Sequence, residues 1–200
     1  MEKTLPRRKG IGKIPRSRER PPRSRALQAA RQILERDGYM RLTMERVASE
    51  SGVAKTTVYR HWPTKAALCM DLYLEVAGQE LQDPQTGDVA ADLEYIVNKV
   101  VQMQTRTIAG PAFRGLIAEA QIDPGAGAAV LADFAARRRE ITRQVLRRAI
   151  DRRQVRRDVD VDLVIDALGG ATTFRLLQGH APLNRRFAER LVALVLDGAR

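Results

Sequence analysis

The sequence has few cysteines, few aromatic residues and no long apolar runs. Its single cysteine, Cys69, excludes an internal disulfide and a cysteine-based metal cluster, and is typical of a reducing compartment. Aromatic residues make up 4% of the chain, so a core must consist mainly of leucine, valine, isoleucine and alanine. No apolar run reaches the roughly 18–20 residues of a membrane-spanning helix, and the N-terminal stretch lacks the apolar region of a secretory signal. We therefore expect a soluble, cytoplasmic protein.

Residue groupings typical of enzymes and metal sites are also missing. The two histidines, His61 and His180, lie far apart in the sequence. There is no glycine-rich phosphate loop and no paired-histidine metal motif. Acidic residues are scattered along predicted helix surfaces without a converging pair. The sequence therefore predicts no catalysis, no metal and no cofactor.

The net charge of +11 is concentrated at one end of the chain. Residues 1–25 contain ten lysines and arginines against two glutamates, a net charge of +8. Four prolines and two glycines in this stretch disfavour a stable helix. We predict that residues 1–22 form a disordered basic arm of the kind that binds nucleic acid. A solubilising tail, or a start site assigned too far upstream, is the alternative interpretation.

From Ser24 onward the apolar residues recur at helical spacing, and no strand-like alternation or hairpin signal is present. Caps and breakers divide this region, for example Thr43 before one helix and Pro63 after another. The pattern predicts an all-α chain of about nine helices. They are expected over residues 24–37, 44–51, 54–61, 65–81, 89–108, 112–122, 126–154, 161–179 and 185–198.

The segment "GVAKTTVYRHWPTKAAL" (52–68) predicts a helix with an unusually polar outer face. On a helical wheel of ~100° per residue, Thr56 and Arg60 point away from the apolar sector, flanked by Thr57 and Tyr59. The residues predicted to face inward are Ala54, Val58 and Trp62. Such an outer face presents hydrogen-bond donors and an aromatic ring to a partner surface.

The spacing around Gly52 is that of a helix-turn-helix. Ala48, four residues before Gly52, is small enough to let two helices approach. Gly52 permits the turn, and Val58, six residues after it, fastens the second helix to the first. The major groove of DNA is wide enough to admit one such helix.

The stretch "LTMERVASESGVAKTTVYRHWPTKAAL" (42–68) resembles the DNA-binding signature of the TetR family of bacterial transcriptional regulators. The shared elements are a Thr-capped helix, Ala-x-x-x-Gly-Val, Val-Tyr-x-His-aromatic, a turn residue and Lys-x-x-Leu. The preceding "ALQAARQILERDGYMRLT" resembles the first helix of that family. Trp62 stands where the family usually has phenylalanine, and many members lack a long arm before Ser24.

This resemblance implies eight DNA-binding residues. Base-edge or nearby contacts are expected from Lys55, Thr56, Thr57 and Arg60. Phosphate contacts are expected from Tyr59, His61, Lys65 and the backbone next to Thr43. Arg60 is the candidate for guanine, because its guanidinium matches O6 and N7 together. The alternative for each is a solvated surface residue, and for His61 it is packing against Trp62.

The resemblance also implies a homodimer through the last two helices, on a pseudo-palindromic DNA site. "DLVIDALGGATTFRLLQG" (162–179) has small residues where two helices can approach closely, and "FAERLVALVLDG" (187–198) has bulky apolar ones. Ordinary packing within one chain is the alternative for both. The expected organisation is an arm over 1–22, a three-helix DNA-binding domain over 23–68, and a larger helical ligand-binding and dimerisation domain over 69–200.

Family members typically release DNA when a small molecule binds to the second domain. The candidates for lining such a site are Tyr95, Met103, Phe113, Ile117, Phe134 and Phe174. Plain core packing is the alternative for each, because apolar residues at helical spacing are common in any core. Few charges interrupt these stretches, which favours an apolar or aromatic effector of unknown identity. Repression is the usual mode of the family.

Two competing functions for the basic residues remain. The arginine-rich run at 136–158 has an apolar stripe opposite its arginines and interspersed acids, the pattern of a solvated helix face rather than of a second nucleic-acid site. The arm alone would favour a protein that coats DNA without sequence preference. The ratio of specific to non-specific affinity distinguishes that function from regulation.

Overall fold

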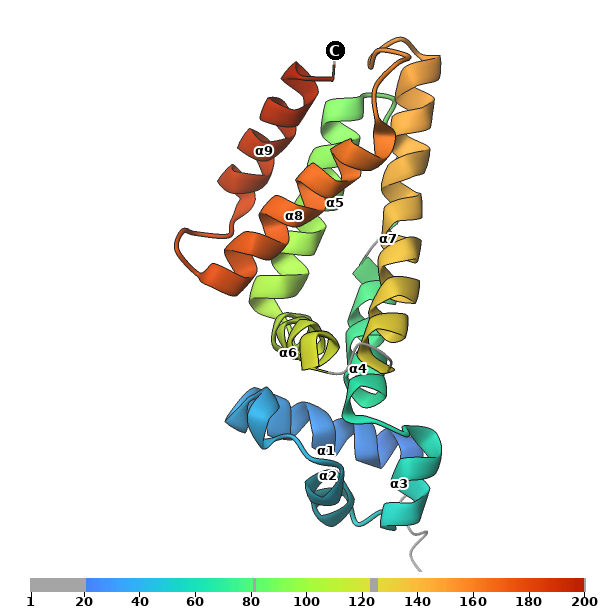
Figure 1. Cartoon of the computed structure of the whole chain (residues 1–200), viewed down its shortest axis with the longest axis vertical. Helices are drawn as coiled ribbons and strands as arrows, with labels where there is room; N and C mark the ends of the chain where they lie inside the picture. The colour runs from blue at the N-terminus through green and yellow to red at the C-terminus, as the bar shows by residue number, and fades with distance from the viewer. Residues whose placement is uncertain (1–20, 81, 123–125, 200) are drawn as a thin grey trace, which may run out of the picture.

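A computed structural model describes residues 21–80, 82–122 and 126–199, without the side chains of 78–80, 122 and most of 126–138. Within this part of the chain the regular structure is entirely helical, as the sequence predicts (Figure 1). No helix there is long and apolar enough to cross a membrane. The elements are α1 (Pro22–Asp37), η1 (Tyr39–Arg41), α2 (Met44–Ser51), α3 (Lys55–His61), α4 (Lys65–Glu80), α5 (Val89–Arg106), α6 (Ala109–Ile122), α7 (Ala126–Asp151), α8 (Val161–Gln178) and α9 (Arg185–Asp197).

Most predicted helix boundaries are confirmed to within a few residues, and α2 agrees at both ends. The predicted start of α6 at residue 112 was wrong, because the helix begins at Ala109 and includes Pro111 in its first turn. Proline is tolerated there, since the first-turn N–H groups have no partner within the helix. The short 3-10 helix η1 was not predicted. The predicted arm, residues 1–22, lies outside the described residues apart from Pro21 and Pro22, which cap and begin α1.

The helices form a small head and a larger body (Figure 1). The head contains α1, η1, α2 and α3, and α4 leads out of it. In the body, α5, α7, α8 and α9 pack together. Helix α6 packs against α4 and also contacts α1 and η1, so it lies between the two parts.

Most of the buried apolar side chains form two clusters. The lower cluster contains most of the buried apolar residues of α1 to α4 and of α6, together with Met103, Ile108 and Leu176. The upper cluster contains those of α7 and α9, most of those of α5 as far as Val101, and those of α8 as far as Leu168, with neighbouring loop residues. The head therefore shares its core with α4 and α6, so α6 is in a position to transmit movements of the body.

Tyr39 of η1 makes a specific contact between head and body. Its hydroxyl donates a hydrogen bond to Glu119 Oε2 on α6 at 2.9 Å. Its ring fills the space beside Gly115, where an added Cβ would lie 2.0 Å from a ring carbon. The Lys65 ammonium lies 3.8 Å from the ring centroid on the head side. Burial raises the pKa of Tyr39, and the nearby Cys69 and Glu119 raise it further, so the hydroxyl stays a donor.

Candidate nucleic-acid interface

The turn between α2 and α3 has the geometry that the sequence predicts. Thr43 caps α2 by accepting a hydrogen bond from the Arg46 backbone N–H at 3.2 Å. Gly52 ends that helix in the left-handed region, with φ of 63°, which a side chain rarely tolerates. Ala48 and Val58 are both buried where the two helices meet. The interpretation of this segment as a helix-turn-helix agrees with these contacts.

Trp62 anchors the far end of α3. The side chain is buried, and its Nε1 donates a hydrogen bond to Asp71 Oδ2 on α4 at 2.6 Å. The same carboxylate oxygen binds the Arg23 guanidinium of α1 at 2.6 Å. These contacts join α1, the end of α3 and α4, and so hold α3 in place within the head.

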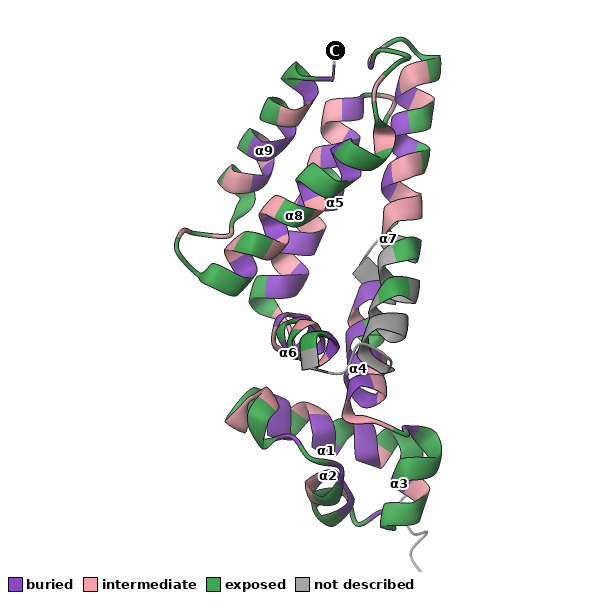
Figure 2. Cartoon of the chain, in the orientation of Figure 1, coloured by how far each residue is buried: buried purple, intermediate pink, exposed green. Residues whose placement is uncertain are grey.

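The outer face of α3 is polar, and much of the helix is exposed (Figure 2). Thr56, Arg60 and His61 are exposed, Thr57 is half-buried, and Val58 is buried. Ala54 is exposed, so its predicted inward position was wrong, because it precedes the first helical turn as the cap. Among the described residues, the Arg60 guanidinium has no hydrogen-bond or ion-pair partner. It is therefore available for a ligand outside the chain.

Glu45, in the first turn of α2, holds two of the predicted DNA-binding residues. Its Oε1 lies 2.7 Å from the Lys55 ammonium and accepts a hydrogen bond from the Tyr59 hydroxyl at 3.1 Å. The hydrogen bond from Lys55 is the main cause that lowers the pKa of Glu45 to about 2. Because that pKa lies below the ordinary value, the carboxylate stays charged at neutral pH and is lost as a partner only in acid. Lys55 and Tyr59 must therefore exchange Glu45 for any DNA group that they bind.

We expect Glu45→Gln to bind duplex DNA of any sequence more tightly than the unmodified protein. The change removes a negative charge beside the phosphates and frees Lys55 and Tyr59. The pair is exposed, so the gain is modest, roughly two- to five-fold in affinity at low salt. Fluorescence anisotropy with a labelled random duplex measures it.

Glu94→Gln, on α5 in the body, is the matched control. It makes the same change in net charge away from α2 and α3. If the two variants gain affinity equally, the effect is one of overall charge, and Glu45 does not restrain the DNA-facing residues.

The other predicted DNA-binding residues, Thr43, His61 and Lys65, each make a contact within the head. Thr43 is exposed, and its hydroxyl is used for capping. Lys65, at the start of α4, is half-buried and also donates to the Tyr39 carbonyl oxygen at 3.5 Å. His61 packs against Trp62, with ring centroids 5.5 Å apart, as the alternative for it anticipated. The binding of Thr43, His61 and Lys65 to DNA remains a prediction.

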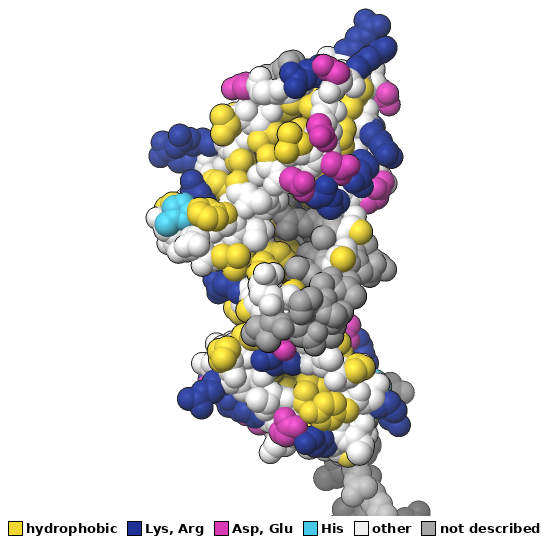
Figure 3. All heavy atoms as spheres, viewed as in Figure 1, with side chains coloured by type: hydrophobic (Ala, Val, Ile, Leu, Met, Phe, Trp, Pro, Cys, Tyr) yellow, Lys and Arg dark blue, Asp and Glu magenta, His cyan; other side chains and the backbone are white. Residues whose placement is uncertain are grey.

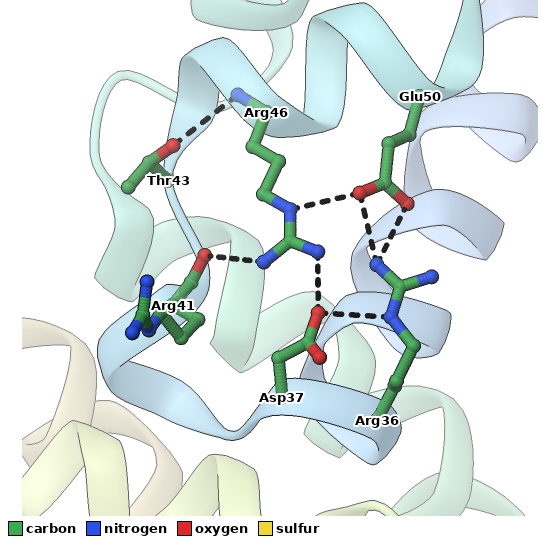
Figure 4. A network of polar contacts seen from close by, with 6 residues as sticks. All are labelled: Arg36, Asp37, Arg41, Thr43, Arg46 and Glu50. Atoms are coloured by element: carbon green, nitrogen blue, oxygen red, sulfur yellow. Dashed lines mark hydrogen bonds and ion pairs between the residues drawn. The ribbon is translucent and has the colours of Figure 1, made fainter.

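Sequence reasoning missed the polar network that fixes α2 (Figure 4). The Arg46 guanidinium donates to Glu50 at 2.8 Å, to the Arg41 carbonyl oxygen at 3.4 Å, and to Asp37. Arg36 binds the same two carboxylates, at 2.9 Å for Asp37 and 3.0 Å for Glu50. These contacts join the end of α1 to α2. Only the i,i+4 spacing of Arg46 and Glu50 was a signal in the sequence.

Four arginines of the 136–158 run are paired with acidic side chains of the described part of the chain: Arg139, Arg143, Arg148 and Arg156. Arg139 and Arg143 bind Asp162 of α8 at 2.8 and 2.6 Å. Arg148 makes a bidentate contact with the Asp83 carboxylate, with N–O distances of 2.5 and 2.8 Å. These pairings agree with the interpretation of the run as a solvated helix face.

The six candidate ligand-lining residues do not gather in one place. Met103 and Phe113 are buried in the lower cluster, with Ile117 packed against it. Tyr95 and Phe174 are 37% and 58% exposed. The expectation of an interior position is wrong for these two within a single chain, because each lies outside the buried face of its helix. The Phe134 side chain lies outside the described residues.

Comparison with known proteins matches both parts of the chain to one family. A family model described as "Bacterial regulatory proteins, tetR family" matches residues 26–71. Another, described as "Tetracyclin repressor-like, C-terminal domain", matches residues 83–195. The first range contains the turn and α3, and the second contains α5 to α8 and nearly all of α9.

Individual proteins are similar over almost the whole chain. The DNA-binding transcriptional repressor TetR of Mycobacteroides abscessus is 32% identical over 187 residues, which cover 89% of this chain and 96% of that protein. The HTH-type transcriptional regulator YdeS of Bacillus subtilis is 26% identical over 92% of this chain and 93% of its own. The crystal structure of the TetR family transcription regulator SCO0332 has a TM-score of 0.72 at 39% identity, over 90% of this chain and 98% of that one.

Proposed function

Since the chain belongs to the TetR family of transcriptional regulators, we propose that it represses transcription by binding a pseudo-palindromic operator as a homodimer. In this proposal a small molecule that binds the body releases the protein from DNA. The protein acts in the cytoplasm, where the bacterial chromosome lies. Members of this family are regulators and not enzymes.

The observation that carries the proposal is the contrast between the two faces of α3. One face holds buried Val58, and buried Trp62 follows at the end of the helix. The other presents exposed Thr56 and an unengaged Arg60. A helix that is held by its buried face and is free on its outer face fits a major groove. Lys55 and Thr57 would contact base edges nearby, and Tyr59, His61, Lys65 and the backbone at Thr43 would bind phosphates.

An exposed apolar seam on α8 supports the proposed dimer. The seam residues recur at spacings of four and three, as in paired helices: Leu163, Ala167, Gly170, Phe174 and Leu177. Leu163 and Phe174 are 65% and 58% exposed, and Leu194 of α9 is 71% exposed. Figure 3 shows hydrophobic side chains on the surface of the body in this view. A Cβ on Gly170 would meet no atom within 4 Å, so a second helix has room to approach. The same face on a second copy would cover the seam symmetrically.

The packing of α6 supports release by an effector. Helix α6 contacts the head through Tyr39 and shares its core with α4. A ligand that favours another position of α6 would favour another position of the head. The two recognition helices of a dimer would then no longer match successive major grooves.

Selection of bound sequences from a random DNA pool tests this function. We expect an enriched pseudo-palindrome whose half-sites lie about one helical turn or a multiple of it apart. Enrichment of no sequence, with affinity that depends only on salt, would instead indicate a protein that coats DNA without preference.

We expect Arg60→Ala to relax sequence preference at one position in each half-site. The lost guanidinium is proposed to read a guanine, and such a contact discriminates by about 1–3 kcal/mol. Repeating the selection with the variant measures the change. Arg157→Ala, an exposed arginine in the loop before α8, removes the same charge and should leave the preference unchanged. If Arg60→Ala keeps the full preference, another residue reads that base.

A further inference from the structure

The two buried clusters separate at a defined level of the body. Along α5, Val101 belongs to the upper cluster and Met103 to the lower one. Along α8, Leu168 and Leu176 show the same change. Gln104 lies on α5 where the change occurs, and it is 3% exposed. A polar residue is therefore enclosed where the apolar packing is interrupted.

The Gln104 side chain has no hydrogen-bond partner among the described residues. Both Nε2 and Oε1 are shielded from solvent and unpaired. Two other buried polar side chains do have partners: Asp92 accepts from Thr86 at 2.6 Å, and Thr172 donates to the Leu168 carbonyl oxygen at 2.7 Å. Leaving an amide unpaired in a core is costly, and proteins normally satisfy it with water or a ligand. The amide of Gln104 is thus an unused donor and acceptor.

The surroundings of Gln104 define the chemistry of a partner. Val100 and Met103 on α5, and Ile108 just after the end of α5, are buried and apolar. Within the described residues Asp92 is the only fully buried charged side chain, and it lies near the opposite end of α5. No buried cation is present there to offset a carboxylate, and no free buried anion to offset an amine. A neutral molecule, largely apolar, fits this environment.

We infer that Gln104 is the hydrogen-bonding anchor of the effector site, and that the effector is a neutral, mostly apolar molecule with a carboxamide or a similar adjacent donor and acceptor. This inference rests on the proposed function, in which a small molecule binds the body. An amide of that kind would accept from Nε2 and donate to Oε1 of Gln104 at once. Its apolar part would lie between the two clusters.

The position of Gln104 also connects this site to the head. A Cβ on Gly110, in the first turn of α6, would lie 1.9 Å from the Gln104 carbonyl oxygen, so α6 packs directly on the backbone of Gln104. The same helix carries Gly115 and Glu119, which hold Tyr39 of the head. A ligand that displaces α5 at Gln104 therefore displaces the start of the helix on which the head is seated.

Three probes with the same apolar tail test the inference: 4-hexylbenzamide, hexylbenzene and 4-hexylbenzoate. Isothermal titration calorimetry on the full chain without DNA measures their affinities. We expect the amide to bind roughly thirtyfold more tightly than hexylbenzene, the value of two net hydrogen bonds of about 1 kcal/mol each. The benzoate should bind most weakly. The amide should also release the protein from the selected operator.

Variants of Gln104 assign the contact. Gln104→Leu should remove the advantage of the amide and leave hexylbenzene binding unchanged. Gln104→Met, unbranched like glutamine, repeats the test if the leucine variant does not fold. Gln102→Leu, half-buried and two residues away on α5, is the matched control and should keep the full preference for the amide.

Three results would overturn the inference: no binding of the amide, equal binding of amide and hydrocarbon, or an amide preference that survives in Gln104→Leu and Gln104→Met. In the last two cases the Gln104 amide is satisfied by water alone. Operator binding is measured separately in the unliganded protein. A chain that selects no operator contradicts the proposed function, whereas one that selects an operator but does not distinguish the probes contradicts only the effector chemistry.

Discussion

The double variant Leu163→Glu/Phe174→Glu is expected to be a monomer and to lose operator affinity by roughly a hundredfold or more, because the two half-sites are then no longer bound together. In a symmetric pair each new carboxylate is duplicated across the seam, where it is both desolvated and repelled. Leu163 and Phe174 are well exposed in the single chain, so the substitutions leave its fold intact. Analytical ultracentrifugation gives the oligomeric state, and anisotropy on the selected operator gives the affinity.

Leu74→Glu is the control for that experiment. Leu74 of α4 is 40% exposed and lies outside the α8 seam, so the variant should remain dimeric and bind the operator normally. A double variant that stays dimeric would show that the dimer uses another surface. A monomer that keeps its operator affinity would contradict the proposed mode of binding.

Gly110→Ala is expected to destabilise the protein by about 3 kcal/mol or more. The added methyl group would lie 1.9 Å from the Gln104 carbonyl oxygen, which is backbone and not the end of a flexible side chain. Alanine favours a helix by up to about 1 kcal/mol over glycine, too little to offset this overlap. Either α6 moves away from α5 or its first turn unwinds. The midpoint of urea denaturation, at unchanged slope, measures the loss.

Gly169→Ala supplies the comparison. An added Cβ at Gly169 of α8 meets no atom within 4 Å, so the same substitution in a helix should be neutral or stabilising by up to about 1 kcal/mol. If Gly110→Ala is no less stable than Gly169→Ala, the junction of α5 and α6 accommodates a methyl group. The close contact between α6 and the Gln104 backbone, through which Gln104 is connected to the head, would then be absent.

Local chemistry made most of the fold predictable from sequence. Helix α2 begins after Thr43, whose hydroxyl caps it, and ends at Gly52, which adopts a left-handed conformation. Both signals are properties of the residues themselves. The start of α6 was missed because Pro111 was interpreted as a break, although the first turn of a helix accepts proline. The helix η1 has no periodicity of its own, since three residues are too few to show one.

The DNA-facing residues were predictable only in part. Helical spacing gave the exposed face that carries Thr56 and Arg60. It did not give the Glu45 contact with Lys55 and Tyr59, because those residues lie on different helices and meet only through the turn. The ligand-lining candidates fared worse. Hydrophobicity alone does not separate an apolar residue in a core, such as Met103, from one on an exposed seam, such as Phe174.

The seat of Tyr39 on α6 limits how this regulator can be recombined with others. A hybrid that joined residues 21–64 to a different sensor would keep the tyrosine but lose two residues that hold it. Gly115 has no side chain and so makes room for the tyrosine ring, and Glu119 accepts a hydrogen bond from the tyrosine hydroxyl. The grafted head would then fold but would lack the Tyr39 contact that couples it to the sensor. A working exchange has to transplant positions 115 and 119 together with the head, although they lie about eighty residues further along the chain.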